Sequence, residues 1–310
     1  MLRWLAMLAV LMMPAVAWSQ SCTFTISDMN FGVVDTLSGA ATNSTSTLNM
    51  TCQGAQRILI CPSLSLGGAG GTAATRVMTG GISQLNYQLY SDPGRSVVWG
   101  SHVSSPPPAP PGFSLTPSNF SSVSGTATIF GSVAGGQGTA RVLLYTSDFS
   151  GSRTDIHYFY SAGNDCTTGE GSSASAPFQV RATVAANCLL TILDIDFGAQ
   201  QVISGNIDAT GQVSVKCTPS TPYTVSLGNG TTGTGPAARR MVKAGVGITY
   251  GLYRNAARNQ VWGDATTPGS TVAGSGSGVA QPLTVYGRVP PQATPSPGVY
   301  NDTVVVTVTY

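Results

Sequence analysis

The chain has 310 residues, of which only 8% are charged, and its 14 lysines and arginines nearly balance 12 acidic residues to give a net charge of +2. This balance leaves no basic face for nucleic acid and no polybasic patch for a membrane surface. Abundant glycine, serine, threonine and valine favour an all-β protein.

The first 19 residues are predicted to be a signal peptide. Arg3 supplies the positive start, residues 5–16 form a short apolar run, and Ala17, Trp18 and Ser19 form a small–x–small cleavage site. The apolar run is too short to span a bilayer. We therefore expect an exported protein.

Beyond the signal peptide, short runs of β-branched residues, or of alternating apolar and polar residues, recur between segments rich in glycine, serine and proline. This pattern predicts antiparallel β-sandwiches with Greek-key connections. The expected strands are 45–51, 57–66, 85–90, 126–133, 141–145, 155–160, 178–184, 212–217, 223–227, 247–253, 283–289 and 303–310.

The chain carries two copies of one pattern. Phe31 follows Cys22 by nine residues, and Phe197 follows Cys188 by the same distance; a glycine comes next in both copies. Further anchors recur in the same order in both copies: Cys52 and Cys217, Tyr87 and Tyr250, Trp99 and Trp262, Phe130 and Tyr286, and an arginine at Arg76 and Arg240. In each copy the tryptophan follows the tyrosine by 12 residues. We predict two tandem domains, residues 20–185 and 186–310, with the tryptophans packed in their cores.

The six cysteines of an exported protein are expected to be oxidised. The repeat pairs Cys22 with Cys52 and Cys188 with Cys217 by symmetry. Cys61 and Cys166 remain, both in the first domain, and form the predicted third bridge.

The sequence contains few residues or motifs that are typical of enzymes. His102 and His157 are the only histidines, and no nucleophile elbow, zinc-protease motif or phosphate loop is present. Asp194 and Asp196 alternate on a strand, and we interpret them as turn-capping groups rather than as a calcium site. We expect no enzyme activity, no cofactor and no metal.

The anchors resemble the spore coat protein U domain family. The matching pieces include the Cys…Phe-Gly start, the Leu283-Thr-Val-Tyr-Gly-Arg288 strand, the Pro297–Thr303 segment and the closing strand; the second domain matches throughout, the first only at the anchors. The resemblance implies immunoglobulin-like sandwiches, the second one lacking its last strand, and subunits of archaic chaperone–usher pili. A two-domain member resembles a pilus tip adhesin. The implied partners are a periplasmic chaperone, an outer-membrane usher and an adjacent pilin subunit that donates a strand.

The segment between the domains has the alternating pattern of a donor strand. Phe178, Val180, Ala182 and Val184 share one face. It could complete the first domain from within the chain, or equally be that domain's ordinary last strand. Only Gln20 and Ser21 stand between the predicted cleavage site and Cys22, so we expect the first domain to donate no strand and to lie at a pilus tip.

No further strand is expected after Tyr310. One interpretation is an open apolar groove in the second domain that a neighbouring subunit fills. The alternative is a complete sandwich whose last strand is 303–310.

The segment after Trp99 is longer by seven residues than its counterpart after Trp262 and is rich in proline and apolar residues. An exposed apolar loop suggests a contact surface. The resemblance to pilus tip adhesins implies that the target is a hydrophobic host or abiotic surface. The predicted adhesive residues are Val103, Pro107, Pro108, Pro110, Pro111, Phe113 and Leu115. In the alternative, Phe113, Leu115 and Phe120 tuck into the domain and the prolines only shape a loop.

The favoured function is a tip subunit that attaches cells to surfaces and supports biofilm. The competing function is a lectin-like or coat protein that binds a glycan through polar groups of the 67–76 and 147–153 loops. The two differ in whether a free sugar blocks binding.

Overall fold

The computed structural model describes residues 20–102, 108–118, 121–160, 165–167, 169, 171–268 and 270–310. The predicted signal peptide, residues 1–19, lies outside this range, as do Val103, Pro107 and Phe120. Within the described part, no helix combines the length and apolar character that crossing a bilayer requires.

The protein is built of β-strands, as the sequence predicts, with a single short 3-10 helix, η1 (Gly151–Arg153), among the described residues. Residues 21–184 form what we call the N-terminal sandwich. Its larger sheet has the order β1 (Ser21–Ile26), β3 (Thr42–Gln53), β8 (Ser122–Val133), β6 (Ser83–Tyr90), β5 (Arg76–Gly80), β9 (Leu143–Phe149), β12 (Phe178–Val184) and β2 (Met29–Val34). Its smaller sheet has the order β11 (Ser172–Ser175), β10 (Thr154–Phe159), β4 (Ile58–Leu64) and β7 (Phe113–Leu115).

Residues 188–309 form the C-terminal sandwich. Five strands make one sheet, in the order β13 (Cys188–Leu193), β14 (Ile207–Cys217), β19 (Gln281–Val289), β17 (Val246–Tyr253) and β16 (Arg239–Lys243). Three more, β18 (Val272–Ser275), β15 (Pro222–Leu227) and β20 (Val306–Thr309), make the other. The two sandwiches share no sheet, and each has its own large core cluster.

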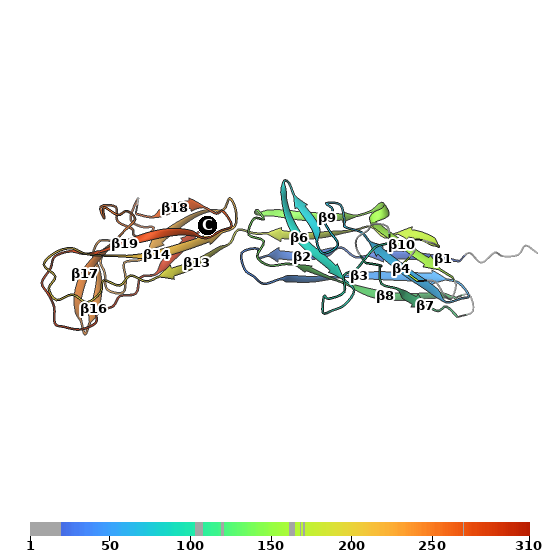
Figure 1. Ribbon diagram of the computed structural model, residues 1–310, viewed down its shortest axis with the longest axis horizontal. Coiled ribbons are helices and arrows are strands. Elements are labelled where there is room, and N and C mark those ends of the chain that lie inside the picture. Colours follow the sequence, from blue (N-terminus) through green and yellow to red (C-terminus); the bar gives the residue numbers. More distant parts are fainter. Residues whose placement is uncertain are drawn as a thin grey trace, which may run out of the picture.

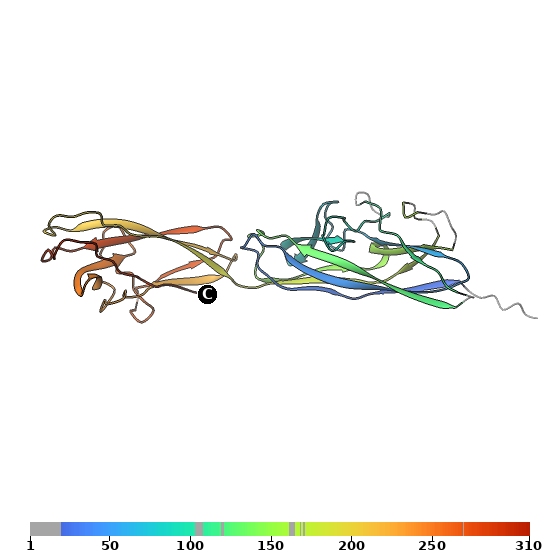
Figure 2. The same cartoon turned by 90° about the horizontal axis from the view of Figure 1, so that it is seen from below.

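The two sandwiches lie end to end in an elongated molecule (Figures 1 and 2). Their contact is polar: Lys216 Nζ donates to the Leu37 carbonyl at 2.9 Å, and Asn187 Nδ2 donates to Asp35 Oδ1 at 3.3 Å. Gly278, with φ +80°, touches Gly138 so closely that a Cβ on Gly278 would lie 1.9 Å from the Gly138 carbonyl oxygen. The junction therefore depends on backbone approach and hydrogen bonds rather than on a shared core.

The repeated tryptophans are core residues in both sandwiches, which confirms that prediction. Trp99 is 0% exposed and donates from Nε1 to the Pro62 carbonyl; Trp262 is 1% exposed and donates to the Val225 carbonyl. Because a buried indole N–H needs an acceptor, each bond ties its tryptophan to the strand beneath it.

The repeated arginine needs a correction, because the counterpart of Arg76 is Arg239 and not Arg240. Arg76 donates to the carbonyls of Ser65, Leu64 and Trp99, and Arg239 donates to those of Gly228, Leu227 and Trp262. Burial lowers the pKa of Arg76 to about 10 and also lowers the pKa of Arg239. These guanidinium groups therefore satisfy carbonyls at and just after the end of one strand, β4 or β15, and at the repeated tryptophan. Arg240 is exposed instead.

Three disulfides join Cys22 to Cys52, Cys61 to Cys166, and Cys188 to Cys217. The first and third each link directly opposed residues of two neighbouring antiparallel strands. The second ties β4 to the segment after β10, and its 105-residue separation makes it the largest loop of the three.

Candidate functional site

The last strand of the N-terminal sandwich, β12, fills a slot between β9 and β2. It pairs antiparallel with β9 over its whole length and parallel with β2. The four alternating side chains of the predicted donor-type segment are all buried, at 5% exposure or less: Phe178, Val180, Ala182 and Val184. Thus this sandwich is closed by a strand that lies between the two repeats in the sequence.

The repeat identifies the same slot in the C-terminal sandwich. Residues 194–200 correspond to the segment of β2, because they lie at the same distance from the first cysteine. The segment beginning at Tyr300 corresponds to β9: the Tyr300 hydroxyl donates to the carbonyl four residues earlier, as the Tyr145 hydroxyl does. Asn301 pairs with β16 as Thr146 pairs with β5. Among the described residues, no strand lies between these two flanks.

A groove of about 410 Å³ occupies that position. Its lining comes from the two flanking segments and from the sheet beneath, and it is mostly apolar: Ile192, Leu193, Asp194, Ile195, Phe197, Gln212, Val213, Leu227, Met241, Tyr250, Leu252, Val285, Tyr300, Asn301, Asp302, Thr303, Val304 and Val306. No lysine or arginine is among these residues.

Burial at matched positions shows what the missing strand would cover. Ile26, four residues after its cysteine, is 8% exposed, whereas Ile192, four residues after its own, is 46% exposed. Phe31 is 6% exposed, whereas Phe197 is only partly buried. Apolar side chains that are core residues in the first copy therefore remain partly open to solvent in the second.

Two carboxylates that line the groove, those of Asp302 and Asp194, differ in the hydrogen bonds that they accept. Asp302 accepts from the Tyr250 hydroxyl at 2.7 Å and from the backbone N–H groups of Thr231 and Thr303. Burial, with the bond to Asp302, raises the pKa of Tyr250 and keeps the phenol as a donor. Asp194 has no side-chain hydrogen bond within the described part of the chain, although its counterpart Asp28 accepts the Gln179 backbone N–H of β12 at 2.8 Å.

The predicted adhesive residues that the structure describes, Pro108, Pro110, Pro111, Phe113 and Leu115, do not form one exposed patch. Pro108 is exposed, Pro111 is half-buried and Pro110 is buried. Phe113 and Leu115 form part of β7 and pack against the core, with the Phe113 ring 5.9 Å from that of Trp99. For these two residues the structure agrees with the alternative in which they tuck into the domain and not with an exposed apolar loop, because β7 pairs with β4 and so turns both side chains inward.

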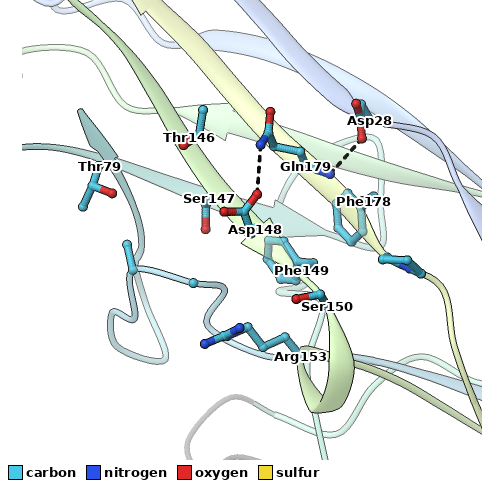
Figure 3. Close-up of a pocket in the computed structure, with 13 residues that line it drawn as sticks. Asp28, Thr79, Thr146, Ser147, Asp148, Phe149, Ser150, Arg153, Phe178 and Gln179 are labelled. Carbon is cyan, nitrogen blue, oxygen red and sulfur yellow. Dashed lines mark hydrogen bonds between the residues drawn. The ribbon is translucent and has the colours of Figure 1, made fainter. Parts of the chain in front are cut away.

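The N-terminal sandwich also has a polar pocket of about 620 Å³, shown in Figure 3. It joins the 67–76 and 147–153 loops, and its charged lining residues are Asp28, Asp148 and Arg153. Gln179 links two of them, since its side chain donates to Asp148 and its backbone N–H to Asp28. The rings of Phe149 and Phe178 stack at 4.6 Å but are buried, so they offer no exposed face to a sugar.

Two comparisons with known proteins bear on these features. Protein U of Myxococcus xanthus is 35% identical over 108 residues, which are 33% of this chain and 59% of that protein, so the chain spans less than two thirds of that relative. The structure of the CsuC–CsuE chaperone–tip adhesion subunit pre-assembly complex, from archaic chaperone–usher Csu pili of Acinetobacter baumannii, is similar with a TM-score of 0.56 and 16% identity. That match covers 94% of this chain and 100% of that one, and at this identity it shows a common fold.

The model of the Spore Coat Protein U domain matches residues 7–150 and 174–307. The two matched regions correspond to the two copies of the repeat, and together they include most of the chain. The match confirms the resemblance that the cysteine, Phe-Gly and Trp-Gly anchors carry. The chain therefore belongs to the Spore Coat Protein U domain family.

Proposed function

We propose that the protein is a subunit of a chaperone–usher pilus and that the groove of its C-terminal sandwich accepts a strand from a neighbouring subunit. The observation that carries this proposal is the contrast between the repeats: β12 fills the slot in one copy, and a groove lies at the same place in the other. An extended segment with alternating apolar residues fits such a groove through main-chain bonds and side-chain pockets. We propose domain limits of 20–185 and 186–310, which the two separate cores support.

The arrangement also supports a place at the pilus tip. Since the N-terminal sandwich already holds β12, it needs no donor, and the protein would join a fibre through its other sandwich alone. A groove that exposes apolar side chains and an unpaired edge needs cover during export. We therefore include a periplasmic chaperone and an outer-membrane usher among the proposed partners, and a cell-surface, non-enzymatic role.

Asp194 provides a direct test of strand acceptance. A peptide with the sequence of residues 176–185, which contains β12, should bind the groove, with the Asp194 carboxylate accepting a backbone N–H as Asp28 does. Because a hydrogen bond to a charged group contributes about 1.5–3 kcal/mol, Asp194→Ala should weaken peptide binding roughly 10- to 100-fold. Asp194→Asn keeps an acceptor and should lose less. Titration calorimetry measures both; equal affinities for all three chains would contradict the assignment.

We further propose that the proline-rich segment after Trp99 contacts hydrophobic surfaces and so supports attachment and biofilm. The structure changes how this is tested, because Phe113 and Leu115 support the core and cannot be replaced without loss of stability. The suitable variant replaces Val103, Pro107 and Pro108 with serine. It should reduce attachment to plastic several-fold with unchanged unfolding, whereas Ile82→Ser, at a side chain 92% exposed on the β5–β6 turn, should not.

The second candidate function is glycan binding in the polar pocket of Figure 3, which the convergence of two predicted loops favours. The same attachment assay separates it from the first. Three results together would assign binding to the pocket and not to the proline-rich segment. A free sugar would block attachment, Asp148→Ala would abolish attachment, and the triple serine variant would attach as the unaltered chain does.

A further inference from the structure

The only two histidines of the chain meet in the N-terminal sandwich, although they are 55 residues apart in the sequence. The rings of His102 and His157 lie edge to face with centroids 4.3 Å apart. Asp155 stands between them: its Oδ2 is 3.0 Å from His157 Nε2 and 3.9 Å from His102 Nε2. One potential ligand atom from each residue lies within 4.8 Å of the other two.

The backbone holds this cluster in place. Asp155 and His157 are two residues apart on β10, so their side chains project from the same face, opposite to the core residues Ile156 and Tyr158. The segment carrying His102 is fixed against β4, since its backbone N–H donates to the buried Ser63 hydroxyl at 2.9 Å. Ligands on a strand and on a pinned backbone are the preorganisation that a metal site requires.

His102 is the observation that points to a missing ligand. Its side chain is only 4% exposed, and neither ring nitrogen has a hydrogen-bond partner within the described part of the chain. Buried polar atoms are normally paired, so an unpaired imidazole aimed at a second histidine and a carboxylate needs an explanation.

We propose that His102, Asp155 and His157 bind a divalent transition-metal ion, with Zn²⁺ as the expected occupant. Zinc bonds of about 2.0–2.2 Å to nitrogen and oxygen place two ligand atoms of one ion roughly 3–4 Å apart, which small side-chain movements can reach from the observed separations. Two imidazoles and one carboxylate are a recurrent zinc ligand set that leaves a fourth position for water. Gly169 lies against the His102 ring, and its lack of a side chain keeps the space beside Nε2 open.

The second repeat lacks every ligand. The strand pairing matches Leu64–Thr154 with Leu227–Val306, which sets Thr307 and Thr309 at the places of Asp155 and His157. Counting from the repeated tryptophans sets Ala265 at the place of His102. The site thus belongs to the N-terminal sandwich alone, where it would fasten residue 102, at the entrance of the proline-rich segment, to β10.

The test uses the untagged exported chain, dialysed against a chelator and then titrated with Zn²⁺ by calorimetry. We expect one Zn²⁺ per chain. With histidine labelled isotopically, the NMR signals of both imidazole rings should shift together, which requires no variant. No uptake, or uptake that leaves both ring signals unmoved, would overturn the proposal.

Variants that install the residues of the other repeat supply matched substitutions. His102→Ala, Asp155→Thr and His157→Thr should each weaken binding by more than the about 10- to 100-fold typical of losing a partner outside the ligand shell. Asp165→Asn removes an exposed acid from the same sandwich that does not belong to the cluster and should bind as the unaltered chain does. Unchanged binding in folded His102→Ala would contradict the assignment.

Discussion

Replacing Val180 with aspartate should unfold the N-terminal sandwich. Val180 is 0% exposed in the middle of β12, opposite Ser147 of β9 and Met29 of β2. An unpaired carboxylate there would have to be buried without a counterion, or β12 would have to leave its slot. Either outcome should cost about 4 kcal/mol or more, a large part of the stability of a typical domain.

The same strand contains a matched control. Thr183 lies on the exposed face of β12, so Thr183→Asp adds the same charge to the same strand without burying it. We expect a change of less than about 0.5 kcal/mol for this substitution. Similar losses for both variants would show that charge, and not the filled slot, decides the result.

The tryptophans make the measurement specific to one sandwich. Four tryptophans occur in the sequence, and two of them fall within the predicted signal peptide. The exported chain therefore has Trp99 as the buried reporter of one sandwich and Trp262 as that of the other. In a Trp262→Phe background, denaturant unfolding followed by fluorescence should show the loss in Val180→Asp directly. If the transition reported by Trp99 keeps the same midpoint in Val180→Asp, β12 does not close the N-terminal sandwich.

The repeat explains why so much of the fold could be predicted from the sequence. Cysteine, aromatic and glycine anchors stand at core or turn positions of both copies, where packing permits few residues. The short strands β5, β7, β11, β16 and β18 were not predicted, because runs of three to five residues carry little periodicity. The six-residue strands β1, β2 and β13 were not predicted either, since their segments were used only as repeat anchors. Arg240 was matched in place of Arg239, although the spacing of the repeat selects Arg239: Arg76 and Arg239 each precede the repeated tyrosine by 11 residues and the tryptophan by 23.

The candidate sites could not be fully predicted from the sequence, because their residues are far apart along the chain and are brought together only by the fold. The proline-rich segment looked exposed in the sequence, but the pairing of β7 with β4 turns Phe113 and Leu115 inward. His102 and His157 carried no motif, since a turn over the sheet and a strand bring them together across 55 residues. The groove was predictable only as one of two alternatives, because pairing alone separates an open slot from a complete sandwich.

Strand acceptance is the central claim, and grafting a donor tests it most directly. The donor is a second copy of residues 176–185, fused after Tyr310 through a glycine–serine linker as long as residues 160–175, which separate β10 from the same segment in the first copy. Since the apolar side chains of Ile192 and Phe197 would become buried as those of Ile26 and Phe31 are, the fusion should raise the unfolding midpoint of the C-terminal sandwich strongly. Trp262 is the reporter, in a Trp99→Phe background. A control donor with aspartate at the places of Val180 and Ala182 should have no effect.

The account predicts that the intact donor raises the midpoint of the Trp262 transition strongly, and that the chain with the control donor unfolds as the unfused chain does. If the unfused chain is already a stable monomer whose Trp262 transition is unchanged by the donor, the C-terminal sandwich is complete and strand acceptance is wrong.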